Sequence, residues 1–341
     1  MAKSSTQKRW HSDYNILFNR AAPKLCMAGF DCRAAAKCHS ISERSILRKL
    51  AENGKVIAVR PSEYIPGAAT LGLQGVGQVS TFSGFCSMHD QRLFARIDNF
   101  DYQLGDAEQE YLFAYRTIAR YHYFNLAWRY GQEAKLAALE DVRAKGERLR
   151  SVVGETSRLL TDAEVERLVQ FHQQATRDAV SSSFEVRDLM GALNAALGSG
   201  DYGAIATRVI VLPNEYPVAQ SSSLILDDAG LTGYPHMITV TVIPQQGRTY
   251  ALLSCTAQHG TSCIDDHLER FRVNGEIDYC AATTHIICMS GDAVAIKPSY
   301  WEAVPDDVRV SFVDRLNTWM SGGVDPVQPD GSFNILLDSI L

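Results

Sequence analysis

Cysteine and histidine residues gather in two short stretches of the chain, and these stretches constrain the fold more than any other feature. They are KLCMAGFDCRAAAKCHSI at residues 24–41 and GFCSMHDQRLF at residues 84–94. Together they supply the candidate ligands Cys26, Cys32, Cys38, His39, Cys86 and His89. Zinc favours four tetrahedral ligands drawn from cysteine thiolates and histidine imidazoles. A shared ion would join the two stretches across the intervening chain.

The second stretch supplies one predicted pair of ligands, because the two residues between Cys86 and His89 let both side chains face one ion at a helix start. The other pair is either Cys26 and Cys32 or Cys32 and Cys38. We favour the former, since a glycine between them suits a turn. The competing interpretation is that the cysteines are simply buried apolar residues. The predicted structural zinc ligands are Cys26, Cys32, Cys86 and His89, with Cys38 and His39 as alternates.

Composition places the chain among globular proteins. It has 341 residues, of which 46% are hydrophobic and 21% are charged. No run of about 18 apolar residues occurs, so we expect no membrane partner. The basic start leads into no apolar segment typical of a signal peptide. With eight cysteines and no export signal, the sequence predicts a cytoplasmic protein whose thiols are reduced or bound to metal.

Charge is distributed unevenly along the chain. Residues 1–60 contain twelve Lys/Arg and four Asp/Glu, a net charge of +8, although the whole chain carries −6. A basic segment around a Cys/His cluster suits a phosphate-bearing partner such as nucleic acid. The alternative is an ordinary solvated face or a disordered basic tail.

Helices are predicted in three segments of the first two thirds of the chain, whereas residues 61–84, which contain Pro61, Pro66 and several glycines, are predicted to form a loop with short strands. Short helices are predicted at residues 41–52 and 87–98, where apolar residues recur at helical spacing. Residues 106–198 have this periodicity nearly throughout, with a capping box of Thr161 and Glu164. An antiparallel helical hairpin with its turn near residues 146–154 is the natural arrangement.

Residues beyond 200 change character. Runs rich in β-branched residues, separated by Pro, Gly and Asn, predict antiparallel strands: ATRVIVLP, SSLILD, MITVTVIP and TYALLSC. A last helix is predicted in DDVRVSFVDRLNTWM, at residues 306–320. Cys280 and Cys288 lie in YCAATTHIICMSG, which we interpret as a further β-rich core segment.

Aromatic residues crowd residues 111–130 and fall all around a helix of that span. This pattern predicts a helix buried on several sides, packed against the zinc core, a protein partner or a second subunit. Arginines interleaved with the aromatic residues leave base stacking as a second interpretation.

The region after residue 250 contains a possible second metal site. Its candidate ligands recur every four residues: Cys255, His259, Cys263 and His267. Residues 260–262 interrupt a continuous helix, however, and Asp265 and Asp266 suit a helix cap instead. We therefore retain both interpretations.

The order of these motifs resembles a known zinc fold. A cysteine pair, then HSI, then GFCSMHDQRLFARID and a helix is similar to the treble-clef core of the His-Asn-His endonuclease family. It also resembles uncharacterised bacterial proteins that share a cysteine pair, HSI, the pattern F.GFC..HD..LF and a helical AYR segment, here at residues 114–116. The resemblance covers residues 20–130.

The nuclease resemblance implies roles for two residues. His39 takes the position of the general base, and Asp90 that of a catalytic metal ligand, where a carboxylate suits Mg²⁺. Cys38 stands before His39 where such nucleases often carry an acidic residue or histidine, and no asparagine is placed to orient the base. These departures favour a role without catalysis.

The sequence therefore predicts an α+β protein in three parts. These are a basic, zinc-bound treble-clef region (1–105), a helical hairpin (106–200) and an antiparallel β-rich domain closed by a helix (201–341). The first functional hypothesis is a zinc-stabilised binding or assembly protein, as in bacterial defence against phage or toxin-type systems. The alternative is a metal-dependent nuclease that uses His39 and Asp90 to hydrolyse phosphodiesters.

Overall fold

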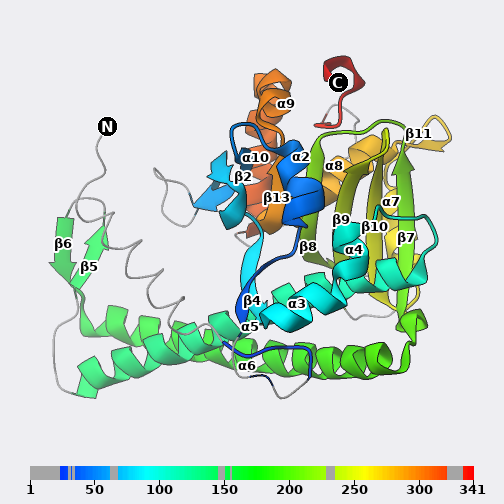
Figure 1. Cartoon of the computed structure of the whole chain (residues 1–341). Helices are drawn as coiled ribbons and strands as arrows, with labels where there is room; N and C mark the ends of the chain where they lie inside the picture. Colours follow the sequence, from blue (N-terminus) through cyan, green and yellow to red (C-terminus); the bar gives the residue numbers. More distant parts are fainter. Residues whose placement is uncertain are drawn as a thin grey trace.

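A computed structural model describes most of the chain. The described residues are 24–29, 32, 35–61, 68–144, 150–153, 156–227, 235–320 and 333–341. Much of the predicted basic segment, including residues 1–23, lies outside them. The fold is mixed α/β, with a large antiparallel sheet and a long helical hairpin (Figure 1).

A seven-stranded antiparallel sheet forms the centre of the molecule, in the order β3-β2-β13-β8-β9-β10-β7. Its strands are β2 (Lys55–Pro61), β3 (Ala69–Gly75), β7 (Ile205–Leu212), β8 (Val218–Asp227), β9 (Pro235–Gln245), β10 (Arg248–Thr256) and β13 (Val294–Ile296). The four predicted strands beyond residue 200 are confirmed as β7 to β10. Because β2 pairs with β13, the sheet draws on both ends of the chain, and the predicted domain boundaries near residues 105 and 200 stay predictions.

Successive residues of the central strands supply two separate cores, as the alternation of side chains across a strand requires. Leu252 packs in the core that contains α5, whereas its neighbour Leu253 packs in the core on the other face. That second core is closed by helices α7 (Ser262–Glu269), α8 (Tyr279–Met289), α9 (Pro298–Ala303) and α10 (Asp306–Met320). The predicted last helix is thus confirmed as α10. The remaining elements of this part are η3 (Tyr202–Ala204), β11 (Arg272–Val273), β12 (Glu276–Ile277), η4 (Gly291–Ala293) and η5 (Asp338–Ile340).

The hairpin consists of the antiparallel helices α5 (Ala107–Ala144) and α6 (Asp162–Ser199). Helix α5 packs against the sheet, α6 packs against α5, and the hairpin extends beyond the sheet (Figure 1). The strands β5 (Arg150–Val153) and β6 (Thr156–Leu159) pair between them. The predicted turn falls in this connection, partly on residues outside those described. The capping box is confirmed: the Thr161 amide donates to Glu164 at 2.8 Å, and the Glu164 amide donates to Thr161 Oγ1 at 3.3 Å.

Helix α5 is enclosed over its first half. Every residue from 111 to 120 is buried, against the sheet, β4 (Thr81–Phe85), α4 (Ala95–Asn99) and α6. The prediction of an aromatic helix buried on several sides is therefore confirmed for this half. Trp128 and Tyr130, farther along, remain substantially exposed.

Two sequence predictions in the last third are wrong. Cys280 and Cys288 lie on helix α8 and not on a strand, because a short run apolar on all sides does not distinguish a buried helix from a buried strand. Helix α7 begins at Ser262 with Thr261 as its N-cap, so Asp265 and Asp266 lie inside the helix. Within the described part of the chain, the four residues of the predicted second metal site form no metal-ligand cluster, and His259 is exposed.

Two buried histidines stack between α7 and α8. The ring centroids of His267 and His285 are 5.5 Å apart, and Phe271 contacts both rings. Burial, the main cause, lowers the pKa of His267 to about 4 and that of His285 to about 3. Both rings are therefore neutral in the folded protein near pH 7.

We expect this pair to make the protein acid-sensitive. Between about pH 6.5 and pH 4 the unfolded histidines bind protons that the folded ones do not, so stability falls as the pH falls. The loss should be about 1–2 kcal/mol per histidine between pH 7 and pH 5, measured by urea unfolding. His285→Gln should shrink this difference, while His259→Gln, at an exposed position, should leave it unchanged. If the free energy of unfolding falls by the same amount between pH 7 and pH 5 in wild type and in His285→Gln, the buried histidine pair is not the cause of the acid sensitivity.

Candidate metal centre

A small hairpin and a short helix carry the candidate site. Strand β1 (Ala36–His39) pairs antiparallel with β4, and α3 (Ser87–Leu93) follows β4 directly. The segment before β1 is attached to this unit, since the Met27 amide donates to the Gly84 carbonyl at 2.8 Å. After β1 the chain forms η1 (Glu43–Leu47) and α2 (Arg48–Leu50), and η2 (Val76–Gln78) precedes β4. The predicted helix at 41–52 is thus a π-helical turn that continues directly into an α-helical one, and the predicted helix at 87–98 is interrupted at Phe94.

The structure brings the four predicted zinc ligands together. Nδ1 of His89 lies 3.3, 3.2 and 3.3 Å from the Sγ atoms of Cys26, Cys32 and Cys86 respectively. All four ligand atoms lie within 4.8 Å of one another. The sulfurs of Cys32 and Cys86 are 3.7 Å apart, close to the ~3.8 Å that two thiolates about 2.3 Å from one tetrahedral zinc would show. This Cys₃His cluster could hold a metal ion such as zinc.

Backbone groups donate hydrogen bonds to two of the cysteines, Cys26 and Cys86. The Cys86 amide donates to Sγ of Cys26 at 3.3 Å. A backbone hydrogen bond from His89, the largest contribution, lowers the pKa of the Cys86 thiol. Thiolate is the form of cysteine that binds metal. The first turn of α3 therefore supplies ligands and stabilises the charged form of Cys86, whereas burial, the largest cause, raises the pKa of the Cys32 thiol to about 11.

The two alternate ligands lie outside the cluster. Cys38 is buried and its thiol donates to the Phe82 carbonyl at 3.2 Å. Nδ1 of His39 bonds to the Val79 carbonyl at 2.9 Å. Among the described residues, the four predicted zinc ligands are the one group of three or more His, Cys, Asp or Glu side chains whose ligand atoms lie close enough together to hold a metal ion.

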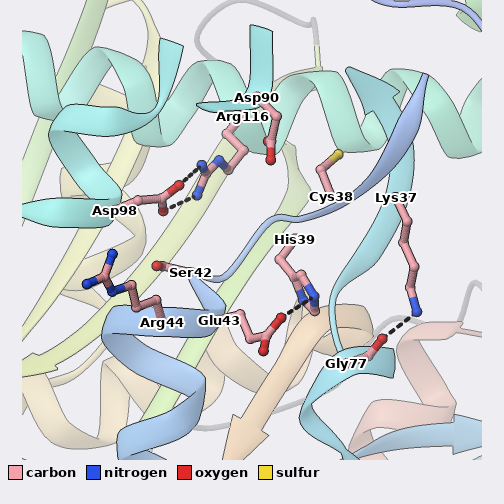
Figure 2. Close-up of a pocket in the computed structure, with 10 residues that line it drawn as sticks. All are labelled: Lys37, Cys38, His39, Ser42, Glu43, Arg44, Gly77, Asp90, Asp98 and Arg116. Carbon is pink, nitrogen blue, oxygen red and sulfur yellow. Dashed lines mark hydrogen bonds and ion pairs between the residues drawn. The ribbon is translucent and has the colours of Figure 1, made fainter. Parts of the chain in front are cut away.

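A polar cavity of about 510 Å³ adjoins the cluster. Both residues that the nuclease resemblance singled out line it: His39 from the end of β1 and Asp90 from α3. Asp90, Arg116 and Asp98 lie on one side of the cavity, and His39 and Glu43 lie across from them (Figure 2). Since Asp90 directly follows the ligand His89, the cluster and the cavity share one turn of α3.

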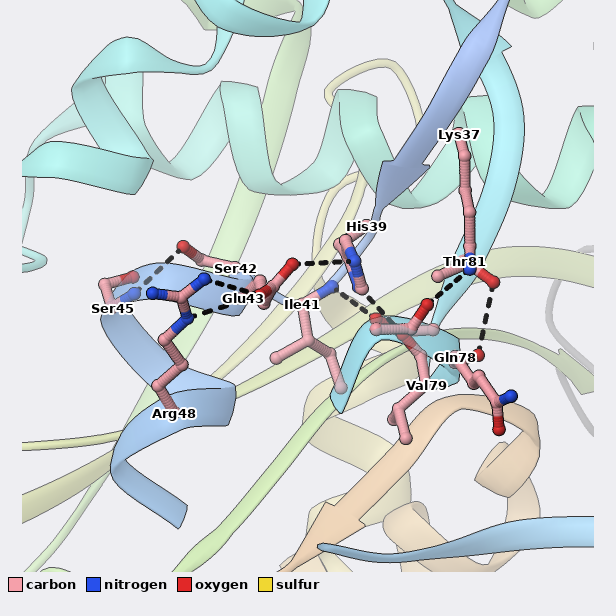
Figure 3. Close-up of polar contacts among 12 residues, drawn as sticks. Lys37, His39, Ile41, Ser42, Glu43, Ser45, Arg48, Gln78, Val79 and Thr81 are labelled. Atoms are coloured by element: carbon pink, nitrogen blue, oxygen red, sulfur yellow. Dashed lines mark hydrogen bonds and ion pairs between the residues drawn. The ribbon is translucent and has the colours of Figure 1, made fainter. Parts of the chain in front are cut away.

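His39 is held at both ring nitrogens. Nδ1 contacts the Val79 carbonyl, and Nε2 lies 3.2 Å from Oε2 of Glu43 (Figure 3). Burial lowers the pKa of His39, with partial compensation from the Val79 carbonyl and Glu43. The imidazole can therefore remain neutral near pH 7, as a general base requires.

Asp90 presents a carboxylate that the protein leaves unsatisfied. Its Oδ1 is buried and has no hydrogen-bond partner among the described residues. Burial raises the pKa of Asp90, and the nearby charge of Arg116 opposes that shift. A buried acceptor without a donor is costly, so a bound cation or ligand would satisfy this oxygen.

Arg116 brings a buried positive charge to the cavity wall from α5. Its two terminal nitrogens donate to Asp98 at 2.9 and 2.6 Å, and its guanidinium lies 3.9 Å from the centre of the Phe94 ring. Sequence reasoning noted Arg116 in the AYR segment but gave it no place in the site. It also missed Glu43 and Asp98, for which no motif provides a signal.

Comparison with known proteins adds no family to this picture. No protein-family model, curated protein or solved structure matches the chain. Among the described helices, none combines the length and apolar character needed to cross a bilayer.

We expect purified protein to contain one zinc per chain, bound by the Cys₃His cluster. Cys86→Ser should lose the metal and several kcal/mol of stability, because binding energy at such sites contributes directly to folding. Elemental mass spectrometry and thermal unfolding measure the two effects. Cys38→Ser is the matched control, since serine can keep the hydrogen bond to Phe82, and it should retain the metal. Equal metal content in wild type and Cys86→Ser would rule out the cluster.

Proposed function

We propose that the chain is a metal-dependent phosphodiesterase that cleaves nucleic acid, a variant of the His-Asn-His type. The observation that carries the proposal is that His39 and Asp90 line one cavity beside the Cys₃His cluster. The sequence ranked this activity second to a binding or assembly role, and the shared cavity reverses that order.

Zinc in the cluster has a structural role in this proposal. Four protein side chains complete a tetrahedral set and leave no position for water or substrate, which is the pattern of a structural site. A hairpin followed by a short helix, with ligands before the hairpin and at the helix start, supports a treble-clef unit. Its task is to hold β1 and α3 so that His39 and Asp90 face the same space.

The cavity supplies the groups that phosphodiester hydrolysis needs. His39, kept neutral by burial, accepts the proton of the attacking water. Asp90 offers a hard oxygen ligand for Mg²⁺, and its unsatisfied Oδ1 fits that task. When bound, such a cation would stabilise negative charge on the phosphate. Arg116 adds a fixed positive charge on the same wall.

The binding or assembly hypothesis has less support from the geometry. Of the segments proposed to contact partners, the basic segment 1–60 is described only in part, since residues 1–23 lie outside the described part of the chain. Residues 111–120 of the aromatic helix are enclosed by the chain itself, which leaves Trp128 and Tyr130 for a partner. A role in bacterial defence or a toxin-type system is compatible with a nuclease and rests on the resemblance to uncharacterised bacterial proteins.

We expect His39→Ala to lower the rate of Mg²⁺-dependent cleavage of DNA or RNA by at least about 10²-fold, the usual contribution of a general base. Asp90→Asn should raise the Mg²⁺ concentration needed for half-maximal rate, because an amide binds the cation more weakly. A gel assay on labelled DNA and RNA measures both.

His259→Ala is the matched control, because this histidine is exposed on the loop after β10, and it should cleave like wild type. Metal content should be unchanged in all three variants. Cleavage by His39→Ala at the wild-type rate would refute the proposal.

A further inference from the structure

Neither ring nitrogen of His39 is open to an attacking water. The Val79 carbonyl can only accept, so Nδ1 carries a hydrogen and donates it at 2.9 Å. Nε2 is then the nitrogen that must take up a proton, and Oε2 of Glu43 lies 3.2 Å from it. The base of the proposed reaction is covered by a carboxylate (Figure 3).

His39 cannot act as a general base while Oε2 of Glu43 contacts its Nε2. When His39 is neutral and Glu43 ionised, two lone pairs face each other and the contact is repulsive. When a proton lies between them, the contact is a charge-assisted hydrogen bond, but Nε2 then has no lone pair for another proton. Glu43 must therefore leave Nε2 before His39 can accept a proton from water.

Arg48 lets Glu43 leave without losing its anchor. Nε and Nη2 of Arg48 both donate to Oε1 of Glu43, at 3.2 and 2.9 Å, and neither uses Oε2. The Glu43 side chain is 32% exposed, so its carboxylate can turn about the Oε1 contact into solvent. The hydrogen-bond pattern thus separates a fixed oxygen from a movable one.

We propose that Glu43 is a positioning residue that covers Nε2 of His39 only while Nε2 carries a proton: it turns away from the neutral imidazole, so that the attacking water can reach Nε2, and covers Nε2 again after proton transfer. The inference rests on the proposed function of His39. In the step itself an O–H bond of water breaks and its proton goes to Nε2. The water oxygen bonds to phosphorus, and the leaving oxygen departs with the electron pair of its P–O bond.

The covered state returns once the proton has moved. His39 is then an imidazolium, and its Nε2–H donates to Oε2 of Glu43. The other charged groups facing His39 are Lys37 on its own strand, Arg116 on α5 and Asp90 on α3. Lys37 and Arg116 disfavour the imidazolium, so Glu43 provides a compensating negative charge at contact distance.

Two substitutions at Glu43 should have different effects: one shifts the pH dependence of the reaction, and the other lowers its rate. Glu43→Ala uncovers Nε2 and removes the stabilising charge, so the acid limb of the kcat/KM profile should move about one pH unit lower. In Glu43→Gln, Arg48 holds the amide oxygen and the NH₂ group donates permanently to Nε2. That variant should lose at least about 10²-fold of its rate at every pH. If Glu43 only supports the fold, both variants would lose activity alike with no shift of the profile, which would overturn the inference.

An NMR titration of the His39 ring nitrogens tests the contact without relying on cleavage. The pH of half-protonation should fall by about one unit in Glu43→Ala relative to wild type, with metal content unchanged. Identical titrations would overturn the inference whether or not the protein is a nuclease. A shifted titration in a protein that cleaves no nucleic acid would leave the contact established and would refute the proposed function instead.

Discussion

The structure depends on enclosing the first half of α5. A helix whose residues 111–120 are all buried has no face for solvent, so other elements must surround it. The sheet covers one side, α6 a second, and β4 with α4 the rest. Arg116 lies within this stretch, and a buried charge is tolerated only when it is paired. Asp98 and the Phe94 ring meet that need, and the Arg116–Asp98 pair lines one side of the cavity.

The sequence predicted best what depends on local patterns. Helices α5, α6 and α10 follow from periodicity and capping, β7 to β10 from β-branched runs, and the Cys₃His cluster from ligand types and spacing. The pairing of β2 with β13 could not be predicted in this way, since it joins segments more than two hundred positions apart. Helix α8 was missed because its residues are apolar on every side, which removes the periodic signal.

The orientation of His39 shows that a motif can identify a site residue without revealing which groups orient it and bind its proton. The resemblance identified His39, and the sequence offered no asparagine to orient it. The structure supplies a main-chain carbonyl instead, that of Val79, which has no signature because every residue has one. Glu43 lies four positions after His39, but the sequence did not identify it as a partner of His39. Glu43 is the first residue of a π-helix, and no spacing rule predicts where that helix begins. Backbone geometry thus sets the tautomer of His39 and the place of its partner Glu43.

The cluster and the cavity cannot be independent. Helix α3 has seven residues, too few to be stable alone in water, and its first turn contains both the ligand His89 and the cavity residue Asp90. Successive residues of a helix point about 100° apart, so the turn that directs His89 into the Cys₃His cluster also directs Asp90 away from it, into the cavity. We expect an ion in the cluster to fix this turn further and, with it, the place of Asp90 across the cavity from His39. In the proposed function, an ion in the cluster would therefore control the chemistry without contacting any reacting atom.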